Sequence, residues 1–352
     1  MQTPYLIFKP KILEKNYREF EILCKKYLVD YMIAYSVKTN SFPLALKKLA
    51  ALGAGFEAAS LDEINAVKNF KTLKIFNGPC KTEEELQKAV KENYCINIDS
   101  LSEIEKLLKL SIKPRNIGLR ASLQKSKFGF DETSLAEAIE IAEAKNLSII
   151  GLHIHLGTQQ TLVEFEKNLS GLYDYLKRFF GKYDEKIHLE YIDIGSGFPD
   201  NFKLKNLGYS LEEYFKSIAE HFANMQKQHG FKIIVEPGRF LVSDAFDLIA
   251  QVNVIKKTFD ETYAIINAGI NILPKISLSQ FKFSKLADKP EKSSVRKQEY
   301  ILAGPLLFNN DILGKFHGNL KEGDLIKIEN VGAYCYNLAW EISYKKPEII
   351  VQ

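Results

Sequence analysis

Charged residues end two of the most apolar runs in the chain. Lys38 closes YMIAYSVK, where an ammonium needs a partner or a reaction because a buried charge is costly. A lysine that reaches solvent from the end of a strand would explain the same pattern. Glu236 closes KIIV, and its carboxylate there needs a cation. Either an ion pair with Arg239 or the protonated ring nitrogen of a bound ligand would supply one.

Two turns that follow apolar runs have the composition of an anion site. Gly195, Ser196 and Gly197 come directly after HLEYIDI. Small residues leave backbone N–H groups free to bind a phosphate, although a tight turn alone also favours glycine. The segment EPGR at 236–239 follows the next run, and Arg239 would add a forked cation.

The elements that must position these residues alternate in type from about residue 31 to 238. Eight β-rich runs alternate with charged stretches of helical period. They are YMIAYSVK, GAGFEAAS, KIFNGP, CINIDS, NIGLRAS, IIGLHIHLG, HLEYIDIGSG and KIIVEPG. Near-continuous Val/Ile/Leu runs are typical of parallel strands covered by helices. We therefore expect an α/β fold with a (β/α)8 TIM barrel, and a doubly wound sheet fits less well, because only a barrel brings all the strand ends to one mouth.

After about residue 245 the pattern changes to short strand-like runs separated by turn residues. This predicts an all-β C-terminal domain, to which YLIFKPK at the start of the chain could add a strand. We expect the barrel to span 26–245 and the β domain to comprise 1–25 and 246–352.

The histidines His153 and His155 are two residues apart on one run. We expect one ring to face the barrel layers and the other the helices or loops. The spacing could suggest metal ligands, but no third ligand lies at matching spacing, so we expect no metal. A ring stacked on a flat cofactor is the better interpretation of His155.

Composition argues against several classes of protein. The net charge of +4 gives no electrostatic case for nucleic acid or membrane binding, and the basic run from Lys282 to Lys297 predicts a solvated loop. The four cysteines lack disulfide or zinc spacing, and no apolar run is long enough to span a bilayer. The first residues do not resemble a signal peptide, so a cytoplasmic protein is expected.

These motifs together resemble the fold-type III pyridoxal 5'-phosphate (PLP) enzymes, in the branch of ornithine and diaminopimelate decarboxylases. The resemblance covers almost the whole chain, in family order. The motifs are YSVKTN, GFEAASLDEI, FNGPCK, INIDSLSEIEKL, LRASLQKSKFGF, LHIHLGTQ, IDIGSGFP, EPGRFLV, AGPLLFNNDIL and VGAYCYNLA. It implies a PLP-binding barrel with a C-terminal β domain, in a head-to-tail homodimer with shared active sites.

The resemblance also implies roles for the matching residues. Lys38 looks like the lysine that holds PLP as a Schiff base, His155 like the ring stacked on it, and Glu236 like the partner of the pyridine nitrogen. The positions that match phosphate contacts are Thr158, Gly195, Ser196, Gly197, Arg239 and Tyr334. Further positions around the cofactor are matched by Glu57, Arg120 and Gly238, and a barrel-rim position by Lys127.

The motif AGPLLFNND departs from the family pattern. Decarboxylases of this branch usually have GPxC and then an acidic residue, which help to protonate the carbanion and to grip a distal amine. Leu307 and Phe308 stand at those positions, with Asp311 further along the predicted substrate pocket. Since Phe308 cannot satisfy an ammonium, we expect a larger, conjugated or less charged substrate. Leu273 likewise stands where diaminopimelate decarboxylases tend to have an arginine.

The resulting prediction is a PLP-dependent carboxy-lyase that removes the α-carboxylate of an amino acid or of a carrier-, siderophore- or nucleotide-peptide-linked conjugate. One alternative is a racemase of the same architecture, although VKTNSFPLAL looks like the decarboxylase branch. Another is an inactive PLP-binding regulator. The missing cysteine supports that alternative, and the presence of Lys38, Glu236 and Arg239 opposes it.

Overall fold

The computed structural model describes residues 2–286 and 298–352, and the chain divides into two compact units. One unit is Glu14–Phe240 and the other combines Met1–Leu13 with Leu241–Gln352, whereas the sequence suggests divisions after residues 25 and 245. Helix α1 (Pro10–Tyr27) accounts for the N-terminal difference. Its Phe20 ring packs edge-on against the rings of Phe198 and Phe215, with centroids 5.0 Å away in each case, which ties the helix to the first unit.

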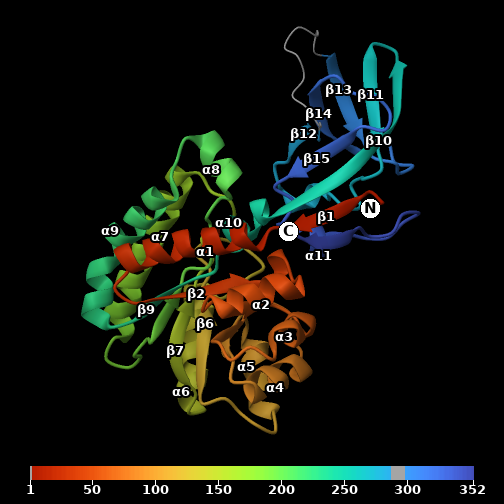
Figure 1. The fold of residues 1–352 in the computed structure, drawn as a ribbon. Coiled ribbons are helices and arrows are strands. Elements are labelled where there is room, and N and C mark those ends of the chain that lie inside the picture. The colour runs from red at the N-terminus through yellow and green to blue at the C-terminus, as the bar shows by residue number, and fades with distance from the viewer. Residues whose placement is uncertain (1, 287–297) are drawn as a thin grey trace. The chain divides into compact units, whose positions relative to one another are not determined.

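The first unit is a closed barrel of parallel strands with helices around it (Figure 1). The strands are β2 (Tyr31–Ser36), β3 (Gly55–Ala58), β4 (Lys74–Phe76), β5 (Cys95–Ile98), β6 (Asn116–Arg120), β7 (Ser148–His153), β8 (Tyr191–Asp193) and β9 (Lys232–Val235). They pair in chain order, and β9 closes the barrel on β2. Each strand lies in one of the predicted runs, and the predicted TIM-barrel class is confirmed.

The connecting helices begin and end at strong local signals. After α1 they are α2 (Pro43–Ala51), α3 (Leu61–Val67), α4 (Glu83–Lys91), α5 (Leu101–Lys109), α6 (Glu132–Ala144), α7 (Leu162–Tyr183), α8 (Asn201–Leu207) and α9 (Leu211–His229). Thr82 and Thr161 form reciprocal capping boxes with Glu85 and Glu164 at the starts of α4 and α7. Gly230 ends α9 in the left-handed conformation. Local signals of this kind fix where each strand end faces the next loop.

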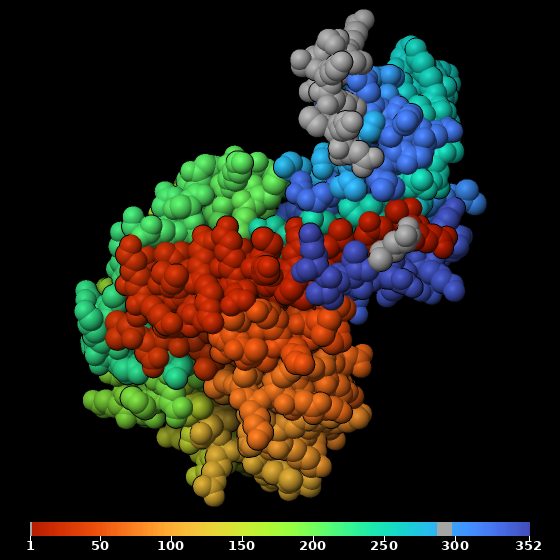
Figure 2. All heavy atoms as spheres, viewed as in Figure 1, coloured from red at the N-terminus to blue at the C-terminus, as the bar shows by residue number. Residues whose placement is uncertain are grey.

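Apolar side chains fill the barrel and its outer layer. Ala34, Ile75 and Ile234 form a buried cluster with the Tyr191 ring inside the barrel. On the outside, α1 and α2 cover adjoining parts of one face (Figure 2), where Lys48 Nζ lies 2.6 Å from Glu14 Oε2. Within the described ranges, no helix combines the length and the apolar character that a membrane crossing requires.

The second unit is mostly β-sheet, as the sequence predicts. Its strands are β1 (Tyr5–Phe8), β10 (Phe246–Thr258), β11 (Glu261–Ile266), β12 (Lys282–Leu286), β13 (Gln298–Ala303), β14 (Ile312–Gly318), β15 (Leu325–Glu329) and β16 (Glu348–Val351), with the short helix α11 (Cys335–Leu338). Helix α10 (Arg239–Val242) begins in the first unit and ends in the second. β1 pairs with both β10 and β16. The solvated loop predicted from Lys282 is wrong for 282–286, which pair with β15, and the rest of that run, 287–297, lies outside the described residues.

Candidate functional site

Lys38 and Glu57 form an ion pair at the carboxyl ends of β2 and β3. Lys38 lies in the short 3-10 turn after β2, and its Nζ donates to Glu57 Oε2 at 2.5 Å. Ser36 Oγ donates to the same oxygen, also at 2.5 Å. The Lys38 side chain is 42% exposed while that of Glu57 is 1% exposed. The buried carboxylate therefore holds an ammonium that solvent can still reach.

The charge of Glu57 depends on this pairing. Burial alone would favour the neutral acid. The Lys38 ammonium and the Ser36 hydroxyl outweigh burial and hold the pKa of Glu57 below its usual value. The pair therefore carries opposite charges at neutral pH.

The glycine turn after β8 is packed between two other loops. Gly195 and Gly197 have φ of +63° and +128°, which glycine adopts without strain. A Cβ atom at Gly195 would lie 2.7 Å from His155 Nδ1. The Gly195 carbonyl accepts from the Glu236 amide at 2.6 Å, so loops 155, 195 and 236 are brought together. Ser196 is half-buried between the two glycines, and Thr158 is exposed in the β7 loop.

The loop after β9 also reaches the residue next to Lys38. A Cβ atom at Gly238 would lie 2.1 Å from Thr39 Oγ1, so only glycine permits this approach. Arg239 is buried at the start of α10, beside the same loop. The lysine, the glycine turn and the EPGR segment thus converge at one end of the barrel, as the sequence predicts for a phosphate-binding mouth.

The two histidines differ in burial. His153 ends β7 and is buried, and His155 lies exposed in the loop that follows. Enclosure by protein, Lys38 and Arg120 lower the pKa of His155 to about 4, and burial, Arg120 and His155 lower that of His153 well below its usual value. β7 ends at His153, so His155 lies outside the strand and strand alternation does not fix the direction of its ring. The expectation that one ring faces the barrel layers and the other the helices or loops stays a prediction.

Two buried carboxyls stand below the mouth. Asp193 ends β8 and Glu236 follows β9, and the two carboxyl groups have oxygens within 4.8 Å of each other. Burial raises the pKa of Asp193 to about 7. Burial, with Asp193 beside it, raises the pKa of Glu236 well above its usual value. A cation that reaches Glu236 would favour the ionised carboxylate instead.

His153, Asp193 and Glu236 also offer ligand atoms within 4.8 Å of one another, which is a possible metal-binding arrangement. The spacing of the histidines along β7 does not indicate this arrangement, because Asp193 and Glu236 follow other strands. The expectation of no metal stays a prediction.

Sequence reasoning also missed polar residues that support the mouth. Asn77 Nδ2 donates to Glu236 Oε1 at 2.7 Å from the loop after β4. Lys81 is fully buried and donates to the carbonyls of Gly78 and Asn97 and to Glu103 Oε2, at 2.7, 2.8 and 2.9 Å. The motif FNGPCK could have indicated them, because its asparagine and lysine directly follow an apolar strand.

Arg120, at the end of β6, is held on two sides. Its Nη1 lies 3.1 Å from Asp99 Oδ2, and its guanidinium lies over the Phe128 ring at 4.4 Å. Arg120 and His155 line opposite parts of a hollow of about 450 Å³ that also includes Ser126 and Asn168. Lys127 is exposed on this rim.

The remaining predicted residues belong to the second unit. Asp311 is buried, and its carboxylate accepts from the amides of Ile270 and Leu306 at 2.7 and 2.8 Å. Leu307 is 100% exposed and Phe308 45% exposed on the loop that Asp311 anchors. Tyr334 is half-buried with φ of +65° at the start of α11.

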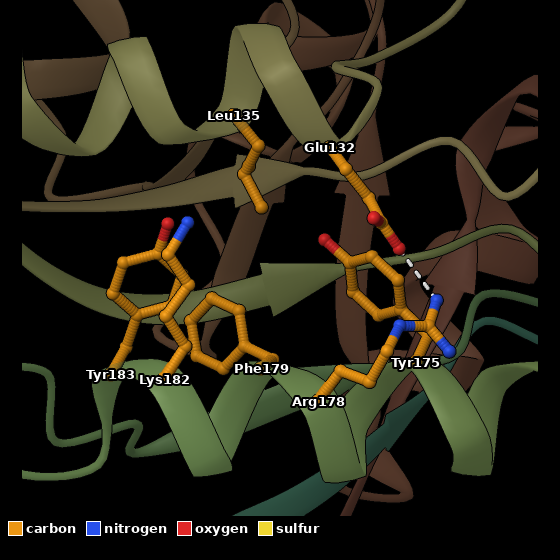
Figure 3. Close-up of a pocket in the computed structure, with 7 residues that line it drawn as sticks. All are labelled: Glu132, Leu135, Tyr175, Arg178, Phe179, Lys182 and Tyr183. Atoms are coloured by element: carbon orange, nitrogen blue, oxygen red, sulfur yellow. Dashed lines mark hydrogen bonds and ion pairs between the residues drawn. The ribbon is translucent and has the colours of Figure 1, made fainter.

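A separate surface groove contains none of the predicted site residues. It has a volume of about 190 Å³ and lies between α6, which contributes Glu132 and Leu135, and α7 (Figure 3). Arg178 pairs with Glu132 across it at 2.5 Å.

Comparison with known proteins agrees with this geometry. Residues 13–243 match the model of the pyridoxal-binding domain of pyridoxal-dependent decarboxylases. The chain is 29% identical to a diaminopimelate decarboxylase of Vibrio cholerae, over 96% of this chain and 84% of the relative, and 28% identical to one of Pseudomonas fluorescens, over 95% and 83%. The structure of diaminopimelate decarboxylase from M. jannaschii in complex with L-lysine superposes with a TM-score of 0.86 at 25% identity, covering 99% of this chain and 87% of that one.

Proposed function

We propose that this chain, which belongs to the family of pyridoxal-dependent decarboxylases, uses Lys38 and Glu236 to hold PLP while it removes the α-carboxylate of an amino acid. The chain is a PLP-dependent amino-acid decarboxylase. One observation carries the residue assignment: Lys38 and Glu236 follow the neighbouring strands β2 and β9, and the glycine turn, which a Cβ atom would fill, follows β8 on the other side of β9. The cradle and the buried carboxyl fit a phosphate and a ring nitrogen.

Different residues of the chain would hold different parts of the cofactor. When bound, PLP supplies an electron sink for the pair of electrons left by the departing carboxylate. Lys38 Nζ would hold the cofactor through its aldehyde carbon, with Glu57 keeping that nitrogen at the mouth. Glu236 would face the ring nitrogen and favour its protonated form, while Gly195, Ser196, Gly197 and Arg239 would hold the phosphate, with Thr158, Tyr334 and Gly238 at its edge. His155, neutral because its pKa is about 4, would cover one face of the ring, with Arg120 nearby.

Lys38 would also carry the proton that replaces the carboxylate. Lys38 Nζ lies at the mouth, where it donates to Glu57 Oε2, and its ammonium could supply a proton there. A neutral His155 cannot donate a proton at neutral pH, and Leu307 has no thiol. Lys38 Nζ is therefore our proposed donor to the substrate Cα.

The substrate proposal rests on the second unit. Asp311 accepts backbone amides with both oxygens and is not available to grip an amine, while Leu307 and Phe308 present apolar surface. An ammonium at the far end of a substrate would be unpaired beside Phe308. We propose a substrate whose far end is apolar or capped, such as an amino-acid conjugate, and a homodimer in which this loop closes the partner's site.

Product analysis tests both the decarboxylase activity and the proposed substrate. Purified protein with PLP would be given diaminopimelate, lysine, ornithine and their side-chain-acylated forms, with release of CO2 and product chirality measured. Borohydride fixation followed by peptide mapping would place the cofactor on Lys38. Inverted stereochemistry with all carbon retained would instead identify a racemase. Faster turnover of the free amines than of the acylated ones would refute the substrate proposal and leave the decarboxylase intact.

A further inference from the structure

A chain of hydrogen bonds crosses the inside of the barrel and ends on Glu236. Tyr191 Oη donates to Asn97 Oδ1 at 2.7 Å, Asn97 Nδ2 donates to Asn77 Oδ1 at 2.9 Å, and Asn77 Nδ2 donates to Glu236 Oε1 at 2.7 Å. All four side chains are buried, and they come from β8, β5, the loop after β4 and the loop after β9. The chain therefore links four separate parts of the barrel.

Two glycines make room for the Tyr191 ring. Gly118 pairs with Asn97 on one side and Gly151 on the other, and Gly151 pairs with Tyr191. A Cβ atom at Gly151 would lie 1.9 Å from Tyr191 Cζ, and one at Gly118 would lie 2.3 Å from Tyr191 Oη. The phenol reaches Asn97 only because neither strand carries a side chain at this level.

The chain has one direction. A phenol that donates to Asn97 Oδ1 leaves the Asn97 amide nitrogen to donate onward, and the same holds for Asn77. Glu236 Oε1 consequently meets an N–H group rather than a carbonyl oxygen. Reversing both amides would turn Asn77 Oδ1 toward the carboxyl and leave the Tyr191 hydroxyl without an acceptor among its described contacts.

This direction matters because the rest of the surroundings oppose an ionised Glu236. Burial, Asp193 and Glu57 all disfavour its charge, and Lys38 is the cation that favours it. The neighbouring Asp193 is itself a carboxyl, which disfavours the charge of Glu236. Asn77 thus supplies the neutral donor that stabilises the ionised carboxylate, and hydrogen bonds to a charged group are among the stronger ones.

We propose that Tyr191, Asn97 and Asn77 are positioning residues for the cofactor, forming a one-way relay that keeps an N–H group on Glu236 Oε1 and so keeps this carboxylate ready for the ring nitrogen. The inference rests on the proposed role of Glu236. It adds that Tyr191 of β8 influences the group that faces the ring nitrogen, although Tyr191 itself would not touch the cofactor.

The test uses two substitutions that preserve shape. Tyr191→Phe removes the first donor. Asn97→Asp still accepts from Tyr191 but, when ionised, cannot donate to Asn77, so it should turn the Asn77 oxygen toward Glu236. Tyr94→Phe is the matched control, because Tyr94 is a buried tyrosine of the same barrel whose hydroxyl lies 3.5 Å from the Ile64 carbonyl and outside the relay.

Two readouts separate positioning from mere stability. One is the nitrogen-15 chemical shift of ring-labelled PLP bound to the full chain, which reports protonation of the ring nitrogen. The other is the dissociation constant of PLP, measured by absorbance titration. We expect Tyr191→Phe and Asn97→Asp each to move the shift toward the unprotonated value and to weaken PLP binding about tenfold, because each would let Asn77 turn its oxygen toward Glu236 and so remove the N–H bond to that carboxylate. We expect Tyr94→Phe to match the wild type in both.

Wild-type values for both Tyr191→Phe and Asn97→Asp would overturn the relay. If Tyr191→Phe does not fold, as shown by circular dichroism, Asn97→Asp decides alone. Glu236→Gln distinguishes failure of the relay from failure of the proposed function. A changed shift in Glu236→Gln with unchanged shifts in the relay variants refutes the relay only, and an unchanged shift in Glu236→Gln refutes the role of Glu236 and the inference with it.

Discussion

The buried Lys81 ammonium offers a sharp test of how the mouth is held. Its side chain is 1% exposed and that of its partner Glu103 is 2% exposed. The three N–H groups go to the Gly78 and Asn97 carbonyls and to Glu103, which use the full donor capacity of an ammonium. Lys81→Met keeps the length and apolar stem of the side chain and removes only the charge and these donors.

The expected cost follows from what the substitution leaves behind. Glu103 would keep the Asp99 amide as a donor at 3.0 Å but would lose its cation while buried. Removing one partner of a buried ion pair typically costs about 3–5 kcal/mol. Lys186→Met is the matched control, because Lys186 and Glu143 are both 64% exposed at 3.7 Å and an exposed pair contributes roughly 0–1 kcal/mol.

Urea unfolding with two probes would measure this cost. Far-ultraviolet circular dichroism reports α1–α9, which surround the barrel, while fluorescence of the single tryptophan, Trp340, reports the second unit. We expect Lys81→Met to lower the dichroism midpoint by about 1–2 M urea, for a slope of about 3 kcal/mol/M, with a smaller effect on fluorescence. A shift no larger than that of Lys186→Met would refute the reasoning. The double variant with Glu103→Leu should recover part of the loss, because the unpaired charge is removed too.

Three further outcomes follow from the same structure. Gly195→Ala should raise the dissociation constant of PLP at least tenfold in an absorbance titration, because its Cβ would lie 2.7 Å from His155 Nδ1 at a φ of +63°. Asp311→Ala should lower the stability seen by Trp340 fluorescence by about 2–5 kcal/mol, since the buried amides of Ile270 and Leu306 lose their acceptor. His155 takes up a proton near pH 6.5 when unfolded but near pH 4 when folded, so stability should fall as pH drops through this window, and His155→Asn should flatten that part of the profile.

Local pattern was enough to predict the barrel strands and the loops that follow them. Each strand is an apolar run, and a run of Val, Ile and Leu bounded by glycine has few other structures available to it. The loop residues Lys38, Gly195 and Glu236 were found for the same reason, since their types are unusual directly after such a run. In a barrel, the residues that follow the carboxyl ends of the strands all lie at one mouth, so their position in the sequence indicates where they lie in space.

The supporting layer was not predictable in this way. Asn77, Asn97 and Tyr191 are ordinary residues in sequence, and their meeting depends on the register in which β5, β6, β7 and β8 pair. The space that Gly118 and Gly151 leave for the Tyr191 ring can be recognised only when the register of those strands is known. Asp311 gave a similar difficulty, because a carboxylate that accepts two amides looks the same in sequence as one that binds a substrate.

The residues with proposed roles differ in the unit to which they belong. Those from Lys38 to Arg239 lie in the barrel unit, whereas Tyr334, Leu307 and Phe308 lie in the second unit. Leu307 and Phe308 lie in the second unit, on a loop whose ends are joined by the pairing of β13 with β14 and by the hydrogen bonds of Asp311. Neither residue is one of those proposed to hold the ring nitrogen or the phosphate. Substrate preference can therefore vary at Leu307 and Phe308 while the ring-nitrogen and phosphate contacts stay as they are, which is why the missing cysteine changes our proposal for the substrate and leaves the assignment of the cofactor site untouched.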